Sequence, residues 1–355
     1  MNKPIIASLA GHSALDIFSG AKARGFNTLA LLVKGRDKTY SVYYKNLCDT
    51  LLYLDSFSQL TTPSVVKQLN NLNSVFIPHR YIQVYCNLTE FENDFAVPVF
   101  GNRKLLKFEE REGRYNQYLI LHRAGVDYPR QFDNPRKIDR LVIIKVREKS
   151  RNYERGFFFA GNYKDYLEKS KDKIKRGQIK KSDLESAVIE EYLVGVQVNF
   201  NFFYSSLSRK LELMGVDTRR QTNIDGLIRL PYFQQKQFLE YSFPSYIESG
   251  HIAVTVKESL LETAYLTAEK IITAARKIAS PGIIGPFALQ TVIVPGPPKE
   301  KIIVFDLSLR IPGSPGTGFT PYSGYLYGKS ISFGDRIIME IENGIKFKKL
   351  SLIIS

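Results

Sequence analysis

The first 33 residues constrain the fold most strongly, because they place one amphipathic helix between two buried strands. Residues 5–10 (IIASLA) and 27–33 (NTLALLV) are continuous apolar runs of strand length. Between them, residues 14–24 carry apolar side chains at helical spacing, and Gly25 ends the helix. A strand, a helix and a strand in this order predict a βαβ unit with parallel strands. We therefore expect a small parallel α/β domain at the start of the chain.

The rest of the chain mixes helical and strand patterns without an internal repeat. We expect further helices at residues 63–72, 108–125 and 258–278, and further strands at residues 74–78, 140–146, 157–161 and 187–195. Residues 285–294 and 300–311 are apolar runs joined by a turn rich in proline and glycine, which predicts a hairpin. The expected fold class is mixed α/β and α+β.

The composition is that of a globular protein that folds without disulfides. Of the 355 residues, 44% are hydrophobic and 24% are charged. Cys48 and Cys86 are too few for a disulfide framework or a cysteine-based zinc site, which favours a reducing compartment. No stretch approaches the roughly 20 apolar residues that span a bilayer. We expect a cytoplasmic protein without a membrane partner.

The net charge of +15 favours anionic partners such as nucleotides, phosphates or nucleic acid. The densest basic run is residues 169–181 (KSKDKIKRGQIKK). Acidic and apolar residues interrupt this run, which favours a solvated helix with a flexible end over a nucleic-acid surface. Charge alone does not choose among these partners.

The loop after the first strand is a candidate binding site. Ser13 and Asp16 have the spacing of a capping box, and the amides that this box leaves free would attract an anion. Gly11 would allow a ligand to approach the end of a parallel strand, where open α/β sheets bind ligands. The alternative is that His12 is an ordinary loop residue, because the loop matches no established phosphate-binding motif.

The predicted hairpin at the end of the chain is a second candidate. Strand alternation places Asp306, Ser308 and Arg310 on one face, and the apolar residues Phe305, Leu307 and Leu309 on the other. Gln290 on the partner strand would face the same side, so two oxygen ligands would meet there. Mg²⁺ accepts such ligands together with waters and phosphates. A half-exposed hairpin with solvated polar residues is the alternative.

Two strands in the middle of the chain carry charges that buried strands usually lack. Lys145 is the only cation in the run LVIIKV and would hold phosphates if it faces a cleft, or have no function if it faces solvent. Glu190 and Glu191 end another strand, where one would accept a hydrogen bond from a ribose or base. Both are surface charges in the alternative interpretation.

Nine segments taken in order resemble an ATP-grasp ligase, specifically the archaeal 5-formaminoimidazole-4-carboxamide ribonucleotide synthetase family. The segments are GHSALDIFSGAKARGFNTL, GNRKLLKFEER, VIIK, IEEYLVGVQVNFNFFYS, NIDGLIRLP, KESLLETAY, GPFALQTVIV, FDLSLRI and PYSGYLYG. The resemblance implies an N-terminal α/β domain (1–100), an ATP-grasp small lobe (101–195) and a large lobe (196–355). It also implies formate activation by ATP and Mg²⁺, or Mn²⁺ in its place, and capture by the amine of the ribonucleotide.

The resemblance also implies roles for individual residues. The ribonucleotide would contact His12, Ser13, Tyr81 and His251, and ATP would contact Lys104, Lys145, Glu190, Glu191 and Gln221. The metal would be held by Gln290 and Asp306, while Lys145 and Arg310 would act in catalysis. No protein nucleophile is required, because formyl phosphate is itself the activated acyl group.

Four departures from the family pattern affect these implications. Asp306 stands where the family usually has glutamate, and the loop REKSRNYERG (147–156) lacks the glycines expected over the phosphates. Tyr81 and His251 replace a serine and an asparagine expected at the ribonucleotide. Two alternatives therefore stay open: a ligase with a different acceptor, and a catalytically silent protein that binds nucleotides or nucleic acid. We also expect a homo-oligomer.

Overall fold

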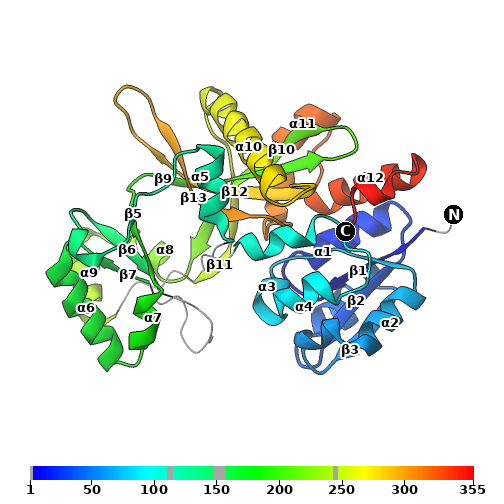
Figure 1. Cartoon of the computed structure of the whole chain (residues 1–355), viewed down its shortest axis with the longest axis horizontal. Coiled ribbons are helices and arrows are strands. Elements are labelled where there is room, and N and C mark those ends of the chain that lie inside the picture. Colours follow the sequence, from blue (N-terminus) through cyan, green and yellow to red (C-terminus); the bar gives the residue numbers. More distant parts are fainter. Residues whose placement is uncertain (1–2, 110–114, 147–156, 243–246) are drawn as a thin grey trace.

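The computed structural model describes residues 3–109, 115–146, 157–242 and 247–355, and its strands form three sheets. Their orders are β3-β2-β1-β4, β11-β10-β9-β12-β13 and β5-β8-β6-β7. The strands are β1 (Ile5–Leu9), β2 (Thr28–Val33), β3 (Thr50–Leu54), β4 (Ser74–Phe76), β5 (Gln131–Phe132), β6 (Val142–Lys145), β7 (Phe157–Ala160), β8 (Val188–Glu191), β9 (Val196–Ser205), β10 (Lys210–Gln221), β11 (Glu248–Val254), β12 (Gly285–Val294) and β13 (Lys301–Ser308). The five-stranded sheet lies between the other two (Figure 1).

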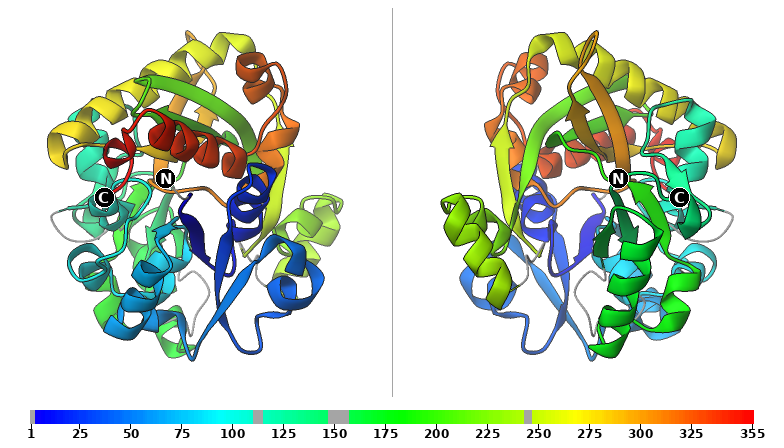
Figure 2. Two further views of the ribbon diagram at one scale, coloured as in Figure 1. Left: turned by 90° about the vertical axis from the view of Figure 1, so that its right-hand side faces the viewer. Right: turned by 90° about the vertical axis from the view of Figure 1, so that its left-hand side faces the viewer.

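Helices cover the sheets, and none of the described helices is long and apolar enough to cross a membrane. They are α1 (Ala14–Ala23), α2 (Pro63–Asn71), α3 (Tyr81–Tyr85), α4 (Leu88–Asn93), α5 (Gln117–Ala124), α6 (Tyr163–Lys175), α7 (Lys181–Glu185), α8 (Ile224–Leu227), α9 (Tyr232–Tyr241), α10 (Glu258–Ile278), α11 (Tyr322–Tyr327) and α12 (Phe333–Lys346). Helix α10 lies across the five-stranded sheet (Figure 2), where Ala268 and Ile271 share a core with Phe202 and Phe287.

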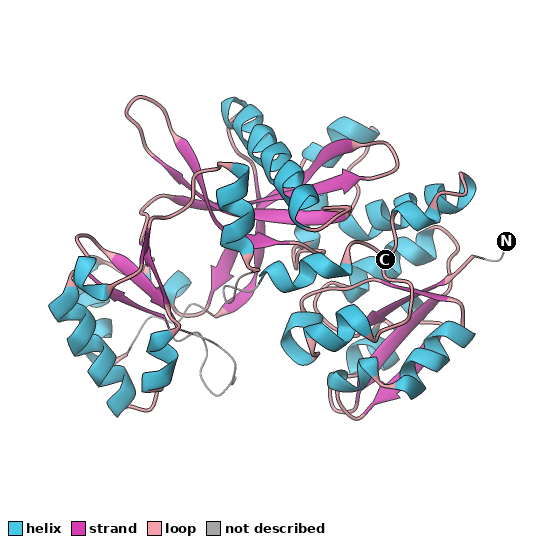
Figure 3. Cartoon of the chain, viewed as in Figure 1, coloured by secondary structure: helices cyan, strands magenta, loops and turns pink. Residues whose placement is uncertain are grey.

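The N-terminal sheet confirms the predicted βαβ unit. Strand β1 pairs in parallel with β2 and with β4. Helix α1 packs on one face of this sheet and α2 to α4 pack on the other, as Figure 3 shows. The edge strand β3 was not predicted: its apolar run is only four residues long (51–54), and Leu51 and Tyr53 in it are exposed. The ends of β1 and β4 carry the loops that reach the candidate site.

The capping-box prediction for α1 was wrong. Ser13 is the first residue before the helix but makes no side-chain bond to it; its hydroxyl donates to Pro312 O at 2.9 Å instead. Asp16 accepts a hydrogen bond from the amide of Gly334, at the start of α12, at 3.0 Å. The two helices touch closely there, since a Cβ on Gly334 would lie 1.9 Å from Asp16 O. The Asp16 carboxylate, which was predicted to cap α1, therefore accepts a hydrogen bond from the start of α12 instead.

Helix α10 and the hairpin β12–β13 are confirmed, and both strands of the hairpin pair in antiparallel register. The helix expected at residues 108–125 begins at Gln117, because the Asn116 side chain accepts from the amides of Tyr118 and Leu119 and so caps it there. The basic run 169–181 is split between the end of α6 and the start of α7. The loop 147–156 lies outside the described residues.

Strands β9, β10 and β11 were not predicted from the sequence. Strands β9 and β10 pair with each other, and polar residues alternate with apolar ones along β9, so neither strand contains the long apolar run that marks the predicted strands. Helix α12 lies near the end of the chain but packs against α1 and shares a core with it. The division at residues 100 and 195 stays a prediction.

Candidate functional site

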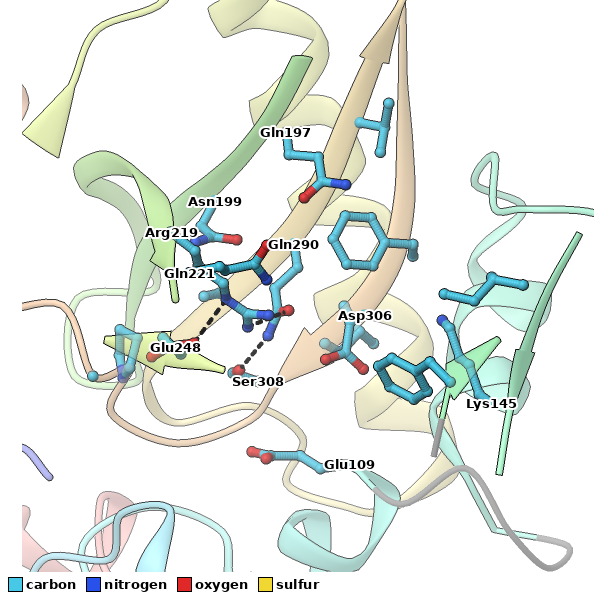
Figure 4. A pocket seen from close by; sticks show the side chains of 18 of the residues that line it. Glu109, Lys145, Gln197, Asn199, Arg219, Gln221, Glu248, Gln290, Asp306 and Ser308 are labelled. Carbon is cyan, nitrogen blue, oxygen red and sulfur yellow. Dashed lines mark hydrogen bonds and ion pairs between the residues drawn. The ribbon is translucent and has the colours of Figure 1, made fainter. Parts of the chain in front are cut away.

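A cavity of about 980 Å³ lies where the three sheets meet, and it is the candidate functional site. Strands of the second and third sheets line it, as do the loops after β1 and β4 of the first. Most of the predicted site residues lie in its wall: His12, Lys145, Glu190, Glu191, Gln221, His251, Gln290, Asp306 and Arg310. Figure 4 shows Lys145 and Glu248 on opposite sides, with Asp306 between them.

A buried ion pair stands where β6 and β8 lie side by side. The Lys145 ammonium pairs with the Glu190 carboxylate, and both side chains are almost fully buried. Strand register explains the contact, because Ile143 opposes Glu190 and Lys145 is two residues further along the same face. The hydroxyl of Tyr118 donates to Glu190 at 2.8 Å. The cation is therefore fixed at the cavity wall.

Glu190 and Glu191 take different partners, as alternation along a strand requires. Glu191 forms an ion pair with Arg140 at 3.0 Å and is partly exposed, while Glu190 is 1% exposed. Both residues still line the cavity. That one of them accepts a hydrogen bond from a ribose or base stays a prediction.

The wall around this ion pair is mostly apolar. It is formed by Ile143, Val146, Phe157, Phe159, Val188, Leu193, Val292 and Phe305. These side chains come from the small sheet, from the segment after β8 and from the hairpin β12–β13. An apolar slot with one cation at its edge suits a planar aromatic ring that carries phosphates.

Gln290 and Asp306 oppose each other in the register of β12 and β13, as expected for a shared face. The Gln290 amide oxygen accepts from Arg219 at 2.5 Å, and its amide nitrogen donates to Ser308 at 3.2 Å. One carboxylate and one amide oxygen fit a divalent cation that takes its other ligands from phosphates and water. The described residues contain no group of three or more His, Cys, Asp or Glu side chains placed to hold a metal by themselves.

The prediction that Phe305 points away from Asp306 was wrong. A bulge interrupts the ladder here, because Gln290 pairs with Asp306 while the next residue, Thr291, pairs with Val304. Phe305 is the extra residue, and such a residue breaks the alternation of faces. Its ring lies in the cavity wall, 5.9 Å from the Lys145 ammonium.

Arg310 is held by a carboxylate that the sequence analysis did not single out. Glu109 lies 3.4 Å from the Arg310 guanidinium and 4.0 Å from that of Arg80, and it also accepts from the Leu309 amide. Burial raises the pKa of Glu109, and the two arginines oppose that rise. One buried carboxylate thus stands between two guanidinium groups in the cavity wall.

His251 lies between two carboxylates. Its Nδ1 pairs with Asp217 and its Nε2 with Glu248 at 2.7 Å. Burial by itself lowers the pKa of His251, but the hydrogen bonds to Asp217 and Glu248 outweigh it and raise the pKa to about 9. Both nitrogens donate, so the ring is an imidazolium at neutral pH. Arg219 also pairs with Glu248, at 3.1 Å.

Three predicted residues lie outside the cavity wall. Ser13 lies behind the wall and contacts two of its residues: its hydroxyl oxygen is 2.6 Å from Nδ1 of His12, and its hydroxyl donates to Pro312 O at 2.9 Å. The Tyr81 ring packs against Gly11, and the Tyr81 hydroxyl accepts a hydrogen bond from Arg36 at 3.2 Å. Lys104 is exposed in the short helical segment Arg103–Glu109. Lys104 does not line the cavity that holds the other residues predicted to bind ATP, and its contact with ATP stays a prediction.

Glu109, Asp217, Arg219 and Glu248 are cavity residues that the sequence analysis missed. Glu109 is one of several charges in FEEREGR, where nothing distinguishes it from a solvated residue. Asp217, Arg219 and Glu248 lie on β10 and β11, strands that were not predicted. The signal that would have found them is the alternation of polar residues along β9 and β10, two of which are Asn199 and Asn201.

Two family models match the chain, a protein of unknown function (DUF1246) over residues 6–132 and a domain of unknown function (DUF1297) over residues 165–355. The 5-formaminoimidazole-4-carboxamide-1-(beta)-D-ribofuranosyl 5'-monophosphate synthetase of Methanocaldococcus jannaschii is 36% identical over 99% of this chain and 94% of its own length. This chain belongs to that synthetase family. The Methanopyrus kandleri relative of the same name is 37% identical over 95% of this chain and 90% of its own.

Solved structures agree with membership of the synthetase family and identify the fold. An IMP biosynthesis protein, PurP, from Thermococcus kodakaraensis matches with a TM-score of 0.74 and 25% identity, over 99% of this chain and all of that chain. An N5-carboxyaminoimidazole synthetase from Staphylococcus aureus, solved with ADP, has a TM-score of 0.61 at 14% identity, over 96% of this chain and 78% of that chain. A biotin carboxylase domain from Hydrogenobacter thermophilus, solved with MgADP, has a TM-score of 0.64 at 12% identity, over 96% of this chain and 70% of that chain. The predicted ATP-grasp fold is confirmed.

Proposed function

We propose that this member of the synthetase family is an ATP-dependent ligase that formylates 5-aminoimidazole-4-carboxamide ribonucleotide with formate, in the formation of IMP. The observation that carries the proposal is one cavity in which Lys145, Asp306, Arg310 and His12 meet from three sheets. A ligase of this kind must bring a nucleotide, a carboxylate and an amine together at one point, because proximity replaces a bimolecular encounter. The cytoplasmic location belongs to the same proposal, and the homo-oligomer stays a prediction.

ATP binds in the apolar slot of the small sheet, with its phosphates directed toward the hairpin β12–β13. The slot supplies apolar contact for the adenine, and Lys145 is the cation at its edge. A buried lysine already paired with Glu190 keeps its position without a ligand, so it is preorganised for phosphate. Glu191 lines the cavity from the small sheet, while Gln221 lines it from β10, on the side away from Lys145 (Figure 4).

Asp306 and Gln290 would hold the divalent cation, Mg²⁺. Bound there, it would supply positive charge against the charge of the transferring phosphoryl group. Arg310 stands two residues beyond Ser308 on the same segment, and Glu109 fixes its guanidinium. A guanidinium held in this way binds a carboxylate such as formate with directed donors.

The chemistry then needs two displacements. A formate oxygen attacks the terminal phosphorus of ATP, which gives formyl phosphate and ADP. The amine of the ribonucleotide attacks the formyl carbon, and phosphate leaves. The side chains of this chain bind, orient and neutralise charge in both steps, and none of them needs to become covalently attached.

The test measures ADP release by the purified protein with ATP, Mg²⁺, formate and the ribonucleotide, each omitted in turn. We expect ADP release and formylated product only when all four are present, and loss of both in Asp306→Ala. Asp335→Ala is the matched control, because Asp335 caps α12 outside the cavity. Formation of product without formate or without ATP would contradict the proposal, and tight ATP binding without turnover would point to a different acceptor.

A further inference from the structure

The hydrogen bonds of His12 fix which of its ring nitrogens carries the proton. The Ser13 hydroxyl donates its single hydrogen to Pro312 O at 2.9 Å, because a carbonyl oxygen only accepts. Its oxygen must therefore accept from His12 Nδ1, which lies 2.6 Å away. In the neutral ring the other nitrogen, Nε2, is then an unprotonated acceptor.

Nε2 of His12 is accessible from the cavity. His12 lines the cavity beside Gly313, and this nitrogen has no hydrogen-bond partner among residues 3–109, 115–146, 157–242 and 247–355. A Cβ on Gly313 would lie 2.6 Å from Nε2, so a side chain there would cover the nitrogen. His12 itself has φ of 49°, a conformation that non-glycine residues seldom adopt. Strained residues of this kind concentrate at functional sites.

The surroundings keep the His12 ring neutral. The His12 side chain is open to the cavity, but the protein packed around it removes much of its solvation and lowers the pKa of His12 well below its usual value. The nearby cations Arg310 and Arg80 lower it further, as do His79 and His251. The His79 ring stacks on His12 with centroids 5.5 Å apart. His79 uses both nitrogens internally, since Nε2 donates to Leu9 O at 2.8 Å and Nδ1 accepts from the Tyr81 amide at 3.2 Å. Only His12 of this pair offers a lone pair to the cavity.

We infer that His12 Nε2 is the base that removes the proton from the attacking amine of the ribonucleotide, an inference that rests on the proposed function. A neutral acceptor nitrogen repels a phosphate oxygen but accepts an N–H, so it selects the amine over the anionic groups of the substrates. Arg310 and Arg80 are the donors for those groups.

The step balances without a further reactant. The amine nitrogen bonds to the formyl carbon and the bond from that carbon to the phosphate oxygen breaks. The nitrogen loses one proton, which passes to His12 Nε2 and makes the ring an imidazolium. The leaving phosphate carries away the electron pair, and the proton returns from His12 to phosphate or solvent. Positioned general bases of this type contribute about 10²–10⁴-fold to rate.

The experiment compares two acceptors in His12→Asn, which keeps an N–H for the Ser13 oxygen but has no basic nitrogen. With the ribonucleotide, kcat should fall by about 10²–10⁴-fold. The wild-type pH profile of kcat should have an acid limb below the usual pKa of histidine, and this limb should disappear in the variant. With hydroxylamine, which traps formyl phosphate without a base, the rate should be retained. Gly313→Ala, which covers Nε2 and leaves the imidazole, should give the same split, and His122→Asn on the exposed face of α5 should change neither rate.

Two results would overturn the inference. A raised KM for the ribonucleotide with unchanged kcat would make His12 a binding residue only. Equal losses with both acceptors would make it a structural residue. If the wild-type protein traps no formyl phosphate from ATP and formate, the proposed function itself fails, and the inference fails with it.

Discussion

The two ends of the cavity differ in charge. At the small sheet, apolar side chains surround Lys145 and Glu190, whose opposite charges balance. At the other end, Arg310 and His251 are among several charged groups drawn from strands and loops of different sheets. The two ends therefore suit different parts of the substrates: an uncharged ring at one, anionic and reacting groups at the other.

This difference shows how one cavity can order a reaction. An apolar slot binds a nucleobase through apolar contact and excludes water. Fixed charges orient groups whose charge changes during the reaction. The net charge of +15 does not reveal this, because the cavity cations are paired with Glu109, Asp217 and Glu248. The predictions below alter one end at a time.

Lys145→Met should have the largest effect, because it removes a cation and leaves Glu190 buried beside an apolar side chain. Breaking a buried ion pair in this way costs about 3–5 kcal/mol. The free energy of unfolding, measured in urea, should fall by that amount, and ADP release should be lost.

Adding Glu190→Gln to Lys145→Met separates the two effects. The double variant should recover most of the stability, since no charge is left unpaired, but none of the ADP release. Equal stability of the single and double variants would show that the two groups do not interact in solution.

His251→Asn tests the charge at the other end through stability. A folded pKa of about 9 against 6.5 in the unfolded chain corresponds to about 3 kcal/mol. Because the folded pKa is raised, this stabilisation is complete below pH 6.5 and is lost as the pH rises through 9. Wild-type unfolding free energy should therefore decline over that interval, relative to the variant. Parallel pH curves for the two proteins would contradict the imidazolium between Asp217 and Glu248.

Glu109→Gln should weaken the hold on Arg310 while keeping a hydrogen-bond acceptor for the Leu309 amide. Hydrogen bonds to charged groups are worth about 1.5–3 kcal/mol, so kcat/KM for formate should fall by about 10–100-fold. The KM for ATP should change little, because the proposed function places ATP at the other end. An equal rise in the KM for formate and the KM for ATP would show that the two ends are not independent.

Lys104→Ala should have the smallest effect. This exposed lysine was predicted to bind ATP, and the structure places it outside the cavity wall. Surface substitutions of this kind usually change stability by less than about 0.5 kcal/mol. An isothermal titration with ATP should give the same affinity as for the wild type, and a clear loss of affinity would revise the boundary of the nucleotide site.

The sequence predicts the elements that have one simple pattern, such as the βαβ unit, α10 and the hairpin β12–β13. Strands β9 to β11 were missed because they contain no long apolar run: the polar residues that face the cavity stand between the apolar ones. The same residues include Asp217 and Glu248, so the missing strands and the missing site residues have one cause. The bulge at Phe305 and the shift of Asp16 to α12 depend on partners far away in sequence, which local spacing does not contain.

The most direct test of the account follows one oxygen of formate. With formate labelled with ¹⁸O, ATP and the ribonucleotide, activation as formyl phosphate transfers one labelled oxygen to the phosphate that is released. We predict one ¹⁸O per phosphate, in amounts equal to the formylated product, and none in Asp306→Ala. Labelled product accompanied by unlabelled phosphate would contradict the central claim that formate is activated on ATP in this cavity.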